Sequence, residues 1–229
     1  GMNAAGTDAK MRNTKESILE AQFTSGAGNW CTWMFGRDLV NWNNNFTWAK
    51  WVTPSRDLIS AFKQEGDEVR FKESIVYYDC NWSNYYPSDN YPFMYKCRSA
   101  NSSIIKYRYA DVLLLKAEAL IMQDTPDLEG AADIIDEVRD RAKLGALPTS
   151  VRSNKNVLLN ALLKERRLEL AFEGQRWFDL VRLDKVEEVM NAVYAKDSGR
   201  KAQIYTFDKN SYRLPIPQSV IDANDKIHQ

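Results

Sequence analysis

The sequence predicts a mainly α-helical protein built from helical hairpins, with long aromatic loops and a few short strands. Two observations support this fold class. Apolar residues recur at helical spacing in three segments, residues 106–123, 129–143 and 158–182. Residues 25–53 and 79–103, in contrast, are rich in Asn, Ser and aromatic residues and show no regular period. Segments of the second kind are typical of loops.

The first two helical segments predict a helical hairpin, with Gly145 ending the second helix. Two antiparallel helices of this length resemble one tetratricopeptide unit, which must stack on other units because it cannot bury its own apolar face. The alternative is a plain hairpin packed on residues 158–182. The expected apolar stripes are Tyr109, Val112, Leu113, Ala117 and Leu120 in the first helix, and Ala131, Ile134, Ile135, Val138 and Ala142 in the second.

The chain before this hairpin predicts shorter elements. Residues 1–14 are small and polar, so we expect a disordered lead-in. Residues 17–24 alternate in part and predict a short strand. A helix over residues 56–63 follows, capped by Thr53 or Ser55. Residues 69–78 fit a helix or a strand, and their IVYY ending favours a strand.

Charged residues fall on the apolar row of the third helical segment, where Arg166 and Glu173 share a face with Leu162 and Leu163. A buried charge is costly unless it is paired and hydrogen-bonded. The sequence therefore predicts an ion-pair network that joins two helices separated by Gly174, which is expected to end the first. The residues of this structural network are Glu165, Arg166, Glu169, Glu173, Arg176 and Asp179, and Asn154 or Ser153 is expected to cap the segment.

A catalytic carboxylate pair, Glu169 and Glu173, is the alternative interpretation of these charges. The alternating signs neutralise the carboxylates, and no histidine lies near them in the sequence. A glycosidase needs two carboxylates across a sugar cleft, and the only dense carboxylates belong to this network. We therefore expect no enzyme activity.

The overall charge excludes several classes of partner. Lys plus Arg and Asp plus Glu are both 31, so the net charge is zero. This balance offers no electrostatic surface for nucleic acid or anionic lipid. No apolar run of about 18 residues predicts a membrane-spanning helix. The first residues lack the apolar core of a signal peptide, and Gly1 before Met2 suggests an expressed fragment.

Cysteine and histidine positions argue against metal and nucleophile chemistry. The cysteines are Cys31, Cys80 and Cys97, none at Cys-x-x-Cys spacing, and the single histidine is His228 beside the terminus. We expect no zinc site, no cofactor and no Ser-His-Asp or Cys-His site. A disulfide between Cys80 and Cys97, which flank the second loop, remains open.

Aromatic residues in the two loops are the strongest functional signal. Residues 25–53 hold five tryptophans among Gly, Asn and Thr, and residues 79–103 repeat the pattern more weakly. A flat indole face can stack on a sugar ring while neighbouring polar side chains bind its hydroxyls. The alternative is that these rings pin the loops to the helical body. The candidate ligand-binding residues are Trp30, Trp33, Trp42, Asn43, Trp82 and Tyr85.

Three ordered segments resemble the SusD/RagB family of nutrient-binding outer-membrane lipoproteins of Bacteroidetes. They are YRYADVLLLKAEAL at 107–120, ERRLELAFEGQRWFDL at 165–180, and YRLPIPQS at 212–219 followed by IDAN at 221–224. All three resemble the C-terminal half of the family, whose members are longer and begin with a lipidated cysteine. The likeness continues weakly upstream and covers most of the chain.

The resemblance implies a SusD-like C-terminal domain over residues 15–229, with a loop-rich aromatic part at 15–103 and a helical part at 104–229. It implies non-catalytic binding of oligosaccharide on the extracellular face of the outer membrane. It also implies delivery of that oligosaccharide to a SusC-type TonB-dependent transporter. The alternative function is a helical protein-interaction scaffold whose aromatic loops contact a protein partner.

Overall fold

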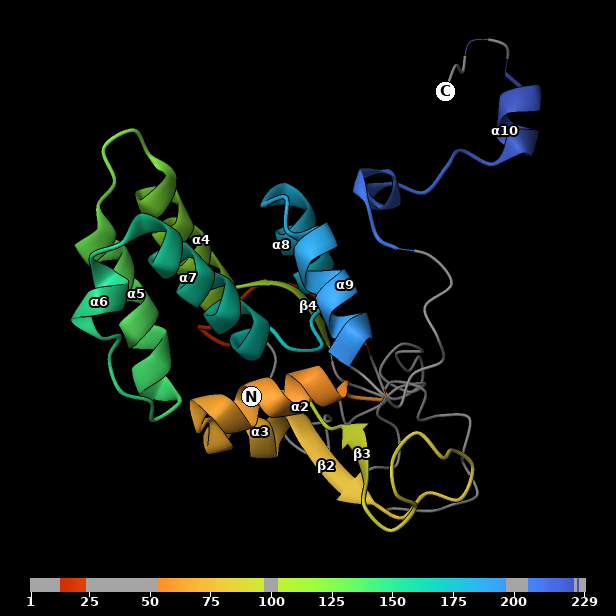
Figure 1. Ribbon diagram of the computed structural model, residues 1–229, viewed down its shortest axis with the longest axis horizontal. Helices are drawn as coiled ribbons and strands as arrows, with labels where there is room; N and C mark the ends of the chain where they lie inside the picture. The colour runs from red at the N-terminus through yellow and green to blue at the C-terminus, as the bar shows by residue number, and fades with distance from the viewer. Residues whose placement is uncertain (1–12, 24–52, 97–102, 197–205, 225, 227–229) are drawn as a thin grey trace. The chain divides into compact units, whose positions relative to one another are not determined.

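The computed structural model describes residues 13–23, 53–96, 103–196, 206–224 and 226. The chain divides into two compact units, residues 1–176 and residues 177–229. Helices predominate in the described residues, and the strands are few and short (Figure 1), so the predicted mainly α class is confirmed. Whether residues 15–229 act as one SusD-like domain stays a prediction.

Among its described residues, the first unit contains two short sheets and most of the helices. Its elements are β1 (Ser17–Ala21), α2 (Arg56–Glu65), α3 (Glu68–Ser74), β2 (Ile75–Tyr78), β3 (Tyr91–Met94), β4 (Ile104–Arg108), α4 (Tyr109–Met122), α5 (Leu128–Arg141), α6 (Thr149–Arg152) and α7 (Lys155–Glu169).

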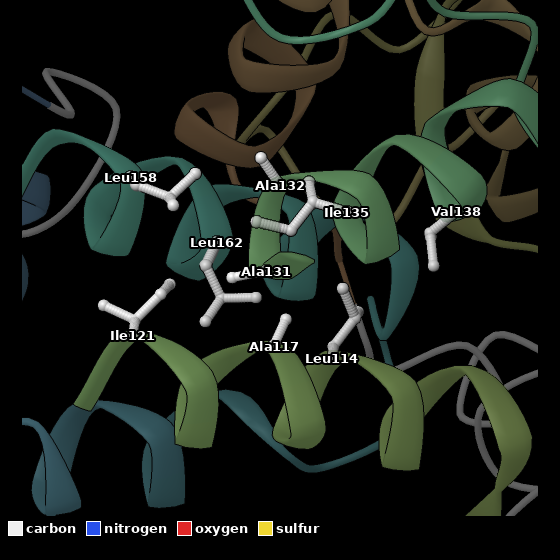
Figure 2. Packing of buried hydrophobic residues seen from close by; sticks show 9 residues of the cluster. All are labelled: Leu114, Ala117, Ile121, Ala131, Ala132, Ile135, Val138, Leu158 and Leu162. Atoms are coloured by element: carbon white, nitrogen blue, oxygen red, sulfur yellow. The ribbon is translucent and has the colours of Figure 1, made fainter. Parts of the chain in front are cut away.

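The main core of this unit lies between α4, α5 and α7. The helices α4 and α5 form a hairpin, and α7 packs against both of them. Figure 2 shows Leu114, Ala117 and Ile121 of α4 facing Leu162 of α7 and Ile135 of α5. All five side chains are fully buried. The hairpin therefore buries its inner face by using α7 as a third layer.

The face that α4 buries differs from the predicted stripe. The helix begins at Tyr109, because residues 104–108 form β4 and pair antiparallel with β1. Tyr109 and Val112 of that stripe are exposed, whereas its Ala117 is buried, together with Ala110, Leu114 and Ile121. A helix that is apolar almost all round gives no single stripe to read, so the packing of α5 and α7 decides which face is buried.

The predicted stripe of α5 and two predicted helix caps are confirmed. Ala131, Ile135 and Val138 are buried against α4 and α7. The hydroxyl of Ser55 accepts from the backbone N–H of Leu58 at 3.1 Å, and Asn154 caps α7 in the same way. Such caps satisfy backbone donors that a helix leaves unpaired at its first turn.

A β-hairpin crosses the region predicted to be a long loop. Residues 69–78 divide into the end of α3 and strand β2, which resolves the ambiguity in the sequence. Strand β3 pairs antiparallel with β2, with Tyr78 opposite Tyr91 and Ile75 opposite Met94. The prediction of an unbroken loop over 79–103 is therefore wrong at β3. Pro92 argued against a strand in the sequence, because proline cannot donate a backbone hydrogen bond. A two-stranded sheet nevertheless has open edges where proline is tolerated.

The end of α7 also differs from the prediction. The helix ends at Glu169, with Leu170 as its C-cap, and not beside Gly174. Phe172 and Gly174 then take positive φ values of 65° and 80°. Glu173 lies in this turn, where its N–H donates to the carbonyl of Leu170 at 3.0 Å. It is therefore not on the helical row assigned to it from the sequence.

The second unit is a smaller helical segment. Helix α8 (Arg176–Arg182) starts at the boundary and is followed by α9 (Val186–Lys196), η3 (Lys209–Tyr212) and α10 (Gln218–Asp222). The Asn191 amide receives a hydrogen bond from the N–H of Phe207 and donates one to its carbonyl, both at 2.9 Å. No helix among the described residues has the length and apolar content needed to cross a membrane.

Candidate functional site

An open cavity of about 790 Å³ lies at the loop of residues 79–90, which joins β2 to β3. Residues 80–88 line it together with Arg56 from the first turn of α2. The cavity brings together Trp82 and Tyr85, two of the predicted ligand-binding residues. The other four, Trp30, Trp33, Trp42 and Asn43, lie outside the described residues.

Trp82 is positioned by a small aromatic core under the loop. Its ring centroid lies 6.0 Å from that of Phe93 on β3, and Phe93 in turn lies 5.2 Å from Tyr91. Tyr91 and Phe93 are buried, while Trp82 is only partly buried. The indole therefore helps to anchor the loop and still contributes surface to the cavity, so the two interpretations of this residue are compatible.

Tyr85 and Tyr86 form a corner against Arg56. Their rings are nearly perpendicular, at 86°, with centroids 4.9 Å apart. The guanidinium carbon of Arg56 lies 4.1 Å from the Tyr85 centroid and 4.4 Å from the Tyr86 centroid. Arg56 also donates a hydrogen bond to the Tyr85 carbonyl, and the Tyr86 hydroxyl donates to the Pro54 carbonyl at 2.8 Å.

Hydroxyl contacts hold the middle of the loop. The Tyr91 hydroxyl lies 2.9 Å from the Ser83 hydroxyl and 3.2 Å from that of Thr53. The Cys80 N–H donates to the Ser88 carbonyl at 2.6 Å and closes the loop. Cys80 is a buried free thiol, and Cys97, the other half of the disulfide that the sequence left open, lies outside the described residues.

Asn81, Asn84 and Ser88 are exposed polar residues of the cavity lining. Each carboxamide can donate and accept hydrogen bonds, which matches the dual character of a sugar hydroxyl. No carboxylate is among the described lining residues. The cavity can therefore hold a flat, hydroxyl-bearing ligand, with part-exposed rings for stacking and amides for orientation.

Arg56 and Tyr86 were not singled out by the sequence as site residues. Tyr86 follows Tyr85 directly in the aromatic segment of the loop, and this segment could have identified Tyr86 as a site residue. Arg56 gave no signal in the sequence, because an arginine in the first turn of a helix has no special role by itself. Its role depends on contact with Tyr85, which is 29 residues away in the chain.

The predicted ion-pair residues of α7 find their partners on other elements. Glu165 pairs with Arg70 of α3 at 2.6 Å and with Arg139 of α5 at 3.3 Å. Glu169 pairs with Arg70 at 3.1 Å and with Arg108 at the end of β4 at 2.7 Å. Glu169 also pairs with Arg141. These contacts join three elements to α7.

The turn after α7 extends the same cluster. Glu173 pairs with Arg108 at 2.7 Å and with Lys96, which follows β3, at 2.5 Å. The Lys96 ammonium also donates to the Glu169 carbonyl at 2.7 Å. Arg108 further pairs with Glu16 at 2.9 Å. We name Glu16, Arg70, Lys96, Arg108, Arg139, Arg141, Glu165, Glu169 and Glu173 the charge cluster.

The other predicted network residues make different contacts. Arg166 is buried and pairs with Asp111 of α4 at 2.9 Å. Arg176 donates to the Leu163 carbonyl at 3.1 Å. Asp179 belongs to the second unit, where it pairs with Arg182 at 2.8 Å. The charged residues predicted to form the network therefore do form ion pairs or hydrogen bonds, but most of their partners lie outside the predicted set.

Burial and opposite charges act on the cluster carboxylates in opposite directions. Burial favours the neutral acid, but Arg108, Arg141 and Lys96 outweigh it and lower the pKa of Glu169 to about 2. Lys96 and Arg108 likewise outweigh burial and lower the pKa of Glu173. Burial prevails over Arg70 and Arg139 at Glu165 and raises its pKa, with a smaller contribution from Glu169. Because Glu165 is only 2% exposed, its raised pKa does not create an acid that a substrate can reach.

A sequence profile of the SusD family, SusD_RagB, matches residues 89–229, which is more than half of the chain. The chain belongs to the SusD family. The matched range contains β3, the α4–α5 hairpin and α7, as well as the second unit. The cavity residues 80–88 lie just before it, so membership of the SusD family identifies none of them as a ligand contact.

Two curated SusD-like relatives come from Formosa agariphila. SusD-like protein P38 is 43% identical over 99 residues, which cover 41% of this chain and 19% of that protein. SusD-like protein P2 is 35% identical over 136 residues, which cover 57% of this chain and 26% of that protein. The chain therefore matches only a minor part of either relative.

A laminarin binding SusD-like protein of known structure has a similar fold. It aligns with 94% of this chain at a TM-score of 0.63 and 25% identity. The alignment covers 49% of that protein, so this chain spans about half of its length.

Proposed function

We propose that this SusD-family chain binds an oligosaccharide at the cavity of the 79–90 loop and does not alter it chemically. The observation that carries the proposal is the joining of Trp82, Tyr85 and Tyr86 with the amides of Asn81 and Asn84 around one cavity of about 790 Å³. This volume falls within the range of roughly 300–1,000 Å³ usual for small-ligand sites. Rings for stacking and a few polar groups for orientation are what a sugar site requires.

The comparisons support a carbohydrate as the ligand class. The chain is a SusD-family member, and a protein of similar fold is described as laminarin binding. Laminarin oligosaccharides are therefore the first ligands to test. Trp30, Trp33, Trp42 and Asn43 remain proposed contacts of the same ligand, on the strength of their composition alone.

The proposed place of action is the extracellular face of the outer membrane, with delivery to a SusC-type TonB-dependent transporter. Family membership supports both statements. The pairing of Glu169 and Glu173 with cations and the depression of both pKa values support a role without catalysis, because neither carboxylate is poised to give or take a proton. Release of reducing sugar from a broad glycan panel would contradict this part of the proposal.

Calorimetric titration with laminarin oligosaccharides tests the binding proposal. Trp82→Ala and Tyr85→Ala are each expected to weaken binding at least about tenfold, since each removes stacking area from the cavity. Tyr107→Ala is the matched control, because Tyr107 is an exposed tyrosine on β4 outside the cavity lining. Equal affinities for wild type, Trp82→Ala and Tyr85→Ala would contradict the proposed site.

A protein-interaction scaffold is the second candidate function. The outward face of α4 exposes Tyr109, Val112 and Leu115, and clustered exposed apolar residues are typical of contact surfaces. Glycan titration, combined with co-purification of a SusC-type transporter, distinguishes the two candidates. The scaffold is favoured if the chain binds no glycan but captures the transporter, and if Val112→Ser and Leu115→Ser abolish that capture.

A further inference from the structure

We propose that Arg56 is a positioning residue of the cavity, which holds the rings of Tyr85 and Tyr86 in their perpendicular arrangement before any ligand binds. The inference rests on the proposed function, because it assigns these two rings to an oligosaccharide. It adds a residue on α2 whose role is to act on the loop and not on the sugar.

The loop cannot orient the two rings by regular secondary structure. Residues 79–90 form neither helix nor strand, so no backbone periodicity directs consecutive side chains such as Tyr85 and Tyr86. The N–H of Tyr85 is held by the Ser83 hydroxyl at 3.3 Å, close to the upper limit for a hydrogen bond. Contacts from outside the loop are therefore needed to set the ring directions.

Those contacts come from the start of α2 and, for Tyr86, also from Tyr91 of β3, whose ring centroid lies 5.6 Å away. Arg56 donates to the Tyr85 carbonyl and places its guanidinium 4.1 Å and 4.4 Å from the two ring centroids. Pro54 accepts the hydrogen bond of the Tyr86 hydroxyl. Arg56 follows the N-cap Ser55, so it projects from the first turn of a helix whose inner face is buried. A guanidinium can stack on aromatic rings and donate to a carbonyl at once, which an ammonium does less well.

This arrangement lowers the entropic cost of binding. An immobilised side chain costs about 0.5–1.5 kcal/mol when it is ordered only on association. With Arg56 in place, Tyr85 and Tyr86 are ordered in the unliganded protein.

The test compares Arg56→Met and Arg56→Lys with wild type and with Lys63→Met in the 229-residue chain. Lys63 is an exposed cation of the same helix outside the lining, so its loss controls for the change in charge. Hydrogen–deuterium exchange is measured by peptide, and affinity for laminarin oligosaccharides is measured by calorimetry. Exchange is the reading that distinguishes local positioning from a general loss of stability.

Arg56→Met is expected to speed exchange in peptides covering residues 79–91, to leave α4, α5 and α7 unchanged, and to weaken sugar binding about tenfold. Arg56→Lys, which keeps the charge near the rings, is expected to lose less affinity. Unchanged exchange or unchanged affinity in Arg56→Met overturns the inference and leaves the proposed function standing. Absence of sugar binding by the wild type overturns the proposed function, and with it the role of Arg56.

Discussion

The helical core and the β2–β3 hairpin of the first unit are built on different principles. Leu114, Leu158 and Leu162 of the core are completely buried, and apolar packing of α4, α5 and α7 holds them. In the hairpin loop, Trp82 and Tyr85 remain partly exposed, and hydrogen bonds and ring contacts from α2 and β3 hold them. The core obtains its stability from surface removed from water, whereas the loop keeps part of its ring surface open to solvent, as the proposed ligand site requires.

The charge cluster connects these two regions. Lys96, two residues beyond the end of β3, pairs with Glu173 and donates to the Glu169 carbonyl. Arg70 of α3 reaches Glu165 and Glu169 of α7. These charges hold the base of the hairpin to α7, together with an apolar cluster in which Ile75 of β2 packs with Leu168 of α7 and with Ala171.

Arg108→Met should have the largest effect on stability. Arg108 is buried and is bound to Glu16, Glu169 and Glu173. Removing one partner of a buried ion pair leaves uncompensated charge, so the free energy of unfolding should fall by about 3–5 kcal/mol. Urea denaturation followed by circular dichroism at 222 nm measures the change.

The matched control for Arg108→Met is Lys72→Met, because Lys72 pairs with Glu68 on the exposed face of α3. No measurable loss of stability is expected for this control. If Arg108→Met is equally harmless, the cluster contributes as little as a solvent-screened surface pair, and the role given to it is wrong.

Acid should weaken the same cluster. The pKa of Glu169 in the folded protein is about 2, below its ordinary value of 4.5, so its ionised form stabilises the fold above pH 4.5. This stability, on the order of 3 kcal/mol, is lost as the pH falls from 4.5 toward 2. Glu165 acts oppositely, because its raised pKa makes the folded state gain stability as the pH falls from 7 toward 4.5, so the net loss between pH 7 and 2 should be smaller.

Urea midpoints at pH 7, 4.5 and 2.5 measure this dependence. Glu169→Gln should show a flatter decline between pH 4.5 and 2.5 than wild type, whereas Glu137→Gln, at an exposed position on α5, should follow the wild type. Identical slopes for Glu169→Gln and wild type would show that other groups govern the acid sensitivity.

Tyr91→Phe should have the smallest effect and should act on the hairpin loop. The substitution keeps the buried ring but removes the hydroxyl that contacts Ser83 and Thr53. A loss of about 1 kcal/mol is expected from thermal or urea unfolding. Tyr77→Phe is the control, because the Tyr77 hydroxyl has no hydrogen bond among the described residues. A larger loss in the control than in Tyr91→Phe would contradict the importance of these hydroxyl contacts.

Local features of this fold could be predicted from the sequence, and features that depend on distant segments could not. Ser55 and Asn154 cap helices because a cap needs only its own next three residues. The buried apolar stripe of α5 could be predicted from the sequence because the opposite face of the helix is polar. The buried face of α4 could not be predicted, since both of its faces are apolar. Packing against α5 and α7 determines which of them is buried.

The candidate site shows the same division. Aromatic residues among amides in a loop suggested Trp82 and Tyr85, because composition alone carries that signal. Arg56 was missed, since its relation to Tyr85 exists only once α2 lies against the loop. The partners of the α7 carboxylates were missed for the same reason, because Arg70 and Glu165 lie 95 positions apart.

The sequence by itself determined the helical class, the caps, the ordered motifs of the SusD family and the aromatic character of the loops, because each depends on residues within a few positions of one another. Tertiary structure alone decided which face of α4 is buried, which strands pair, and which arginines neutralise Glu165, Glu169 and Glu173. It also decided that Arg56 meets two tyrosine rings. Burial and electrostatic pairing depend on distance in space, and that distance is set only when separate segments pack together.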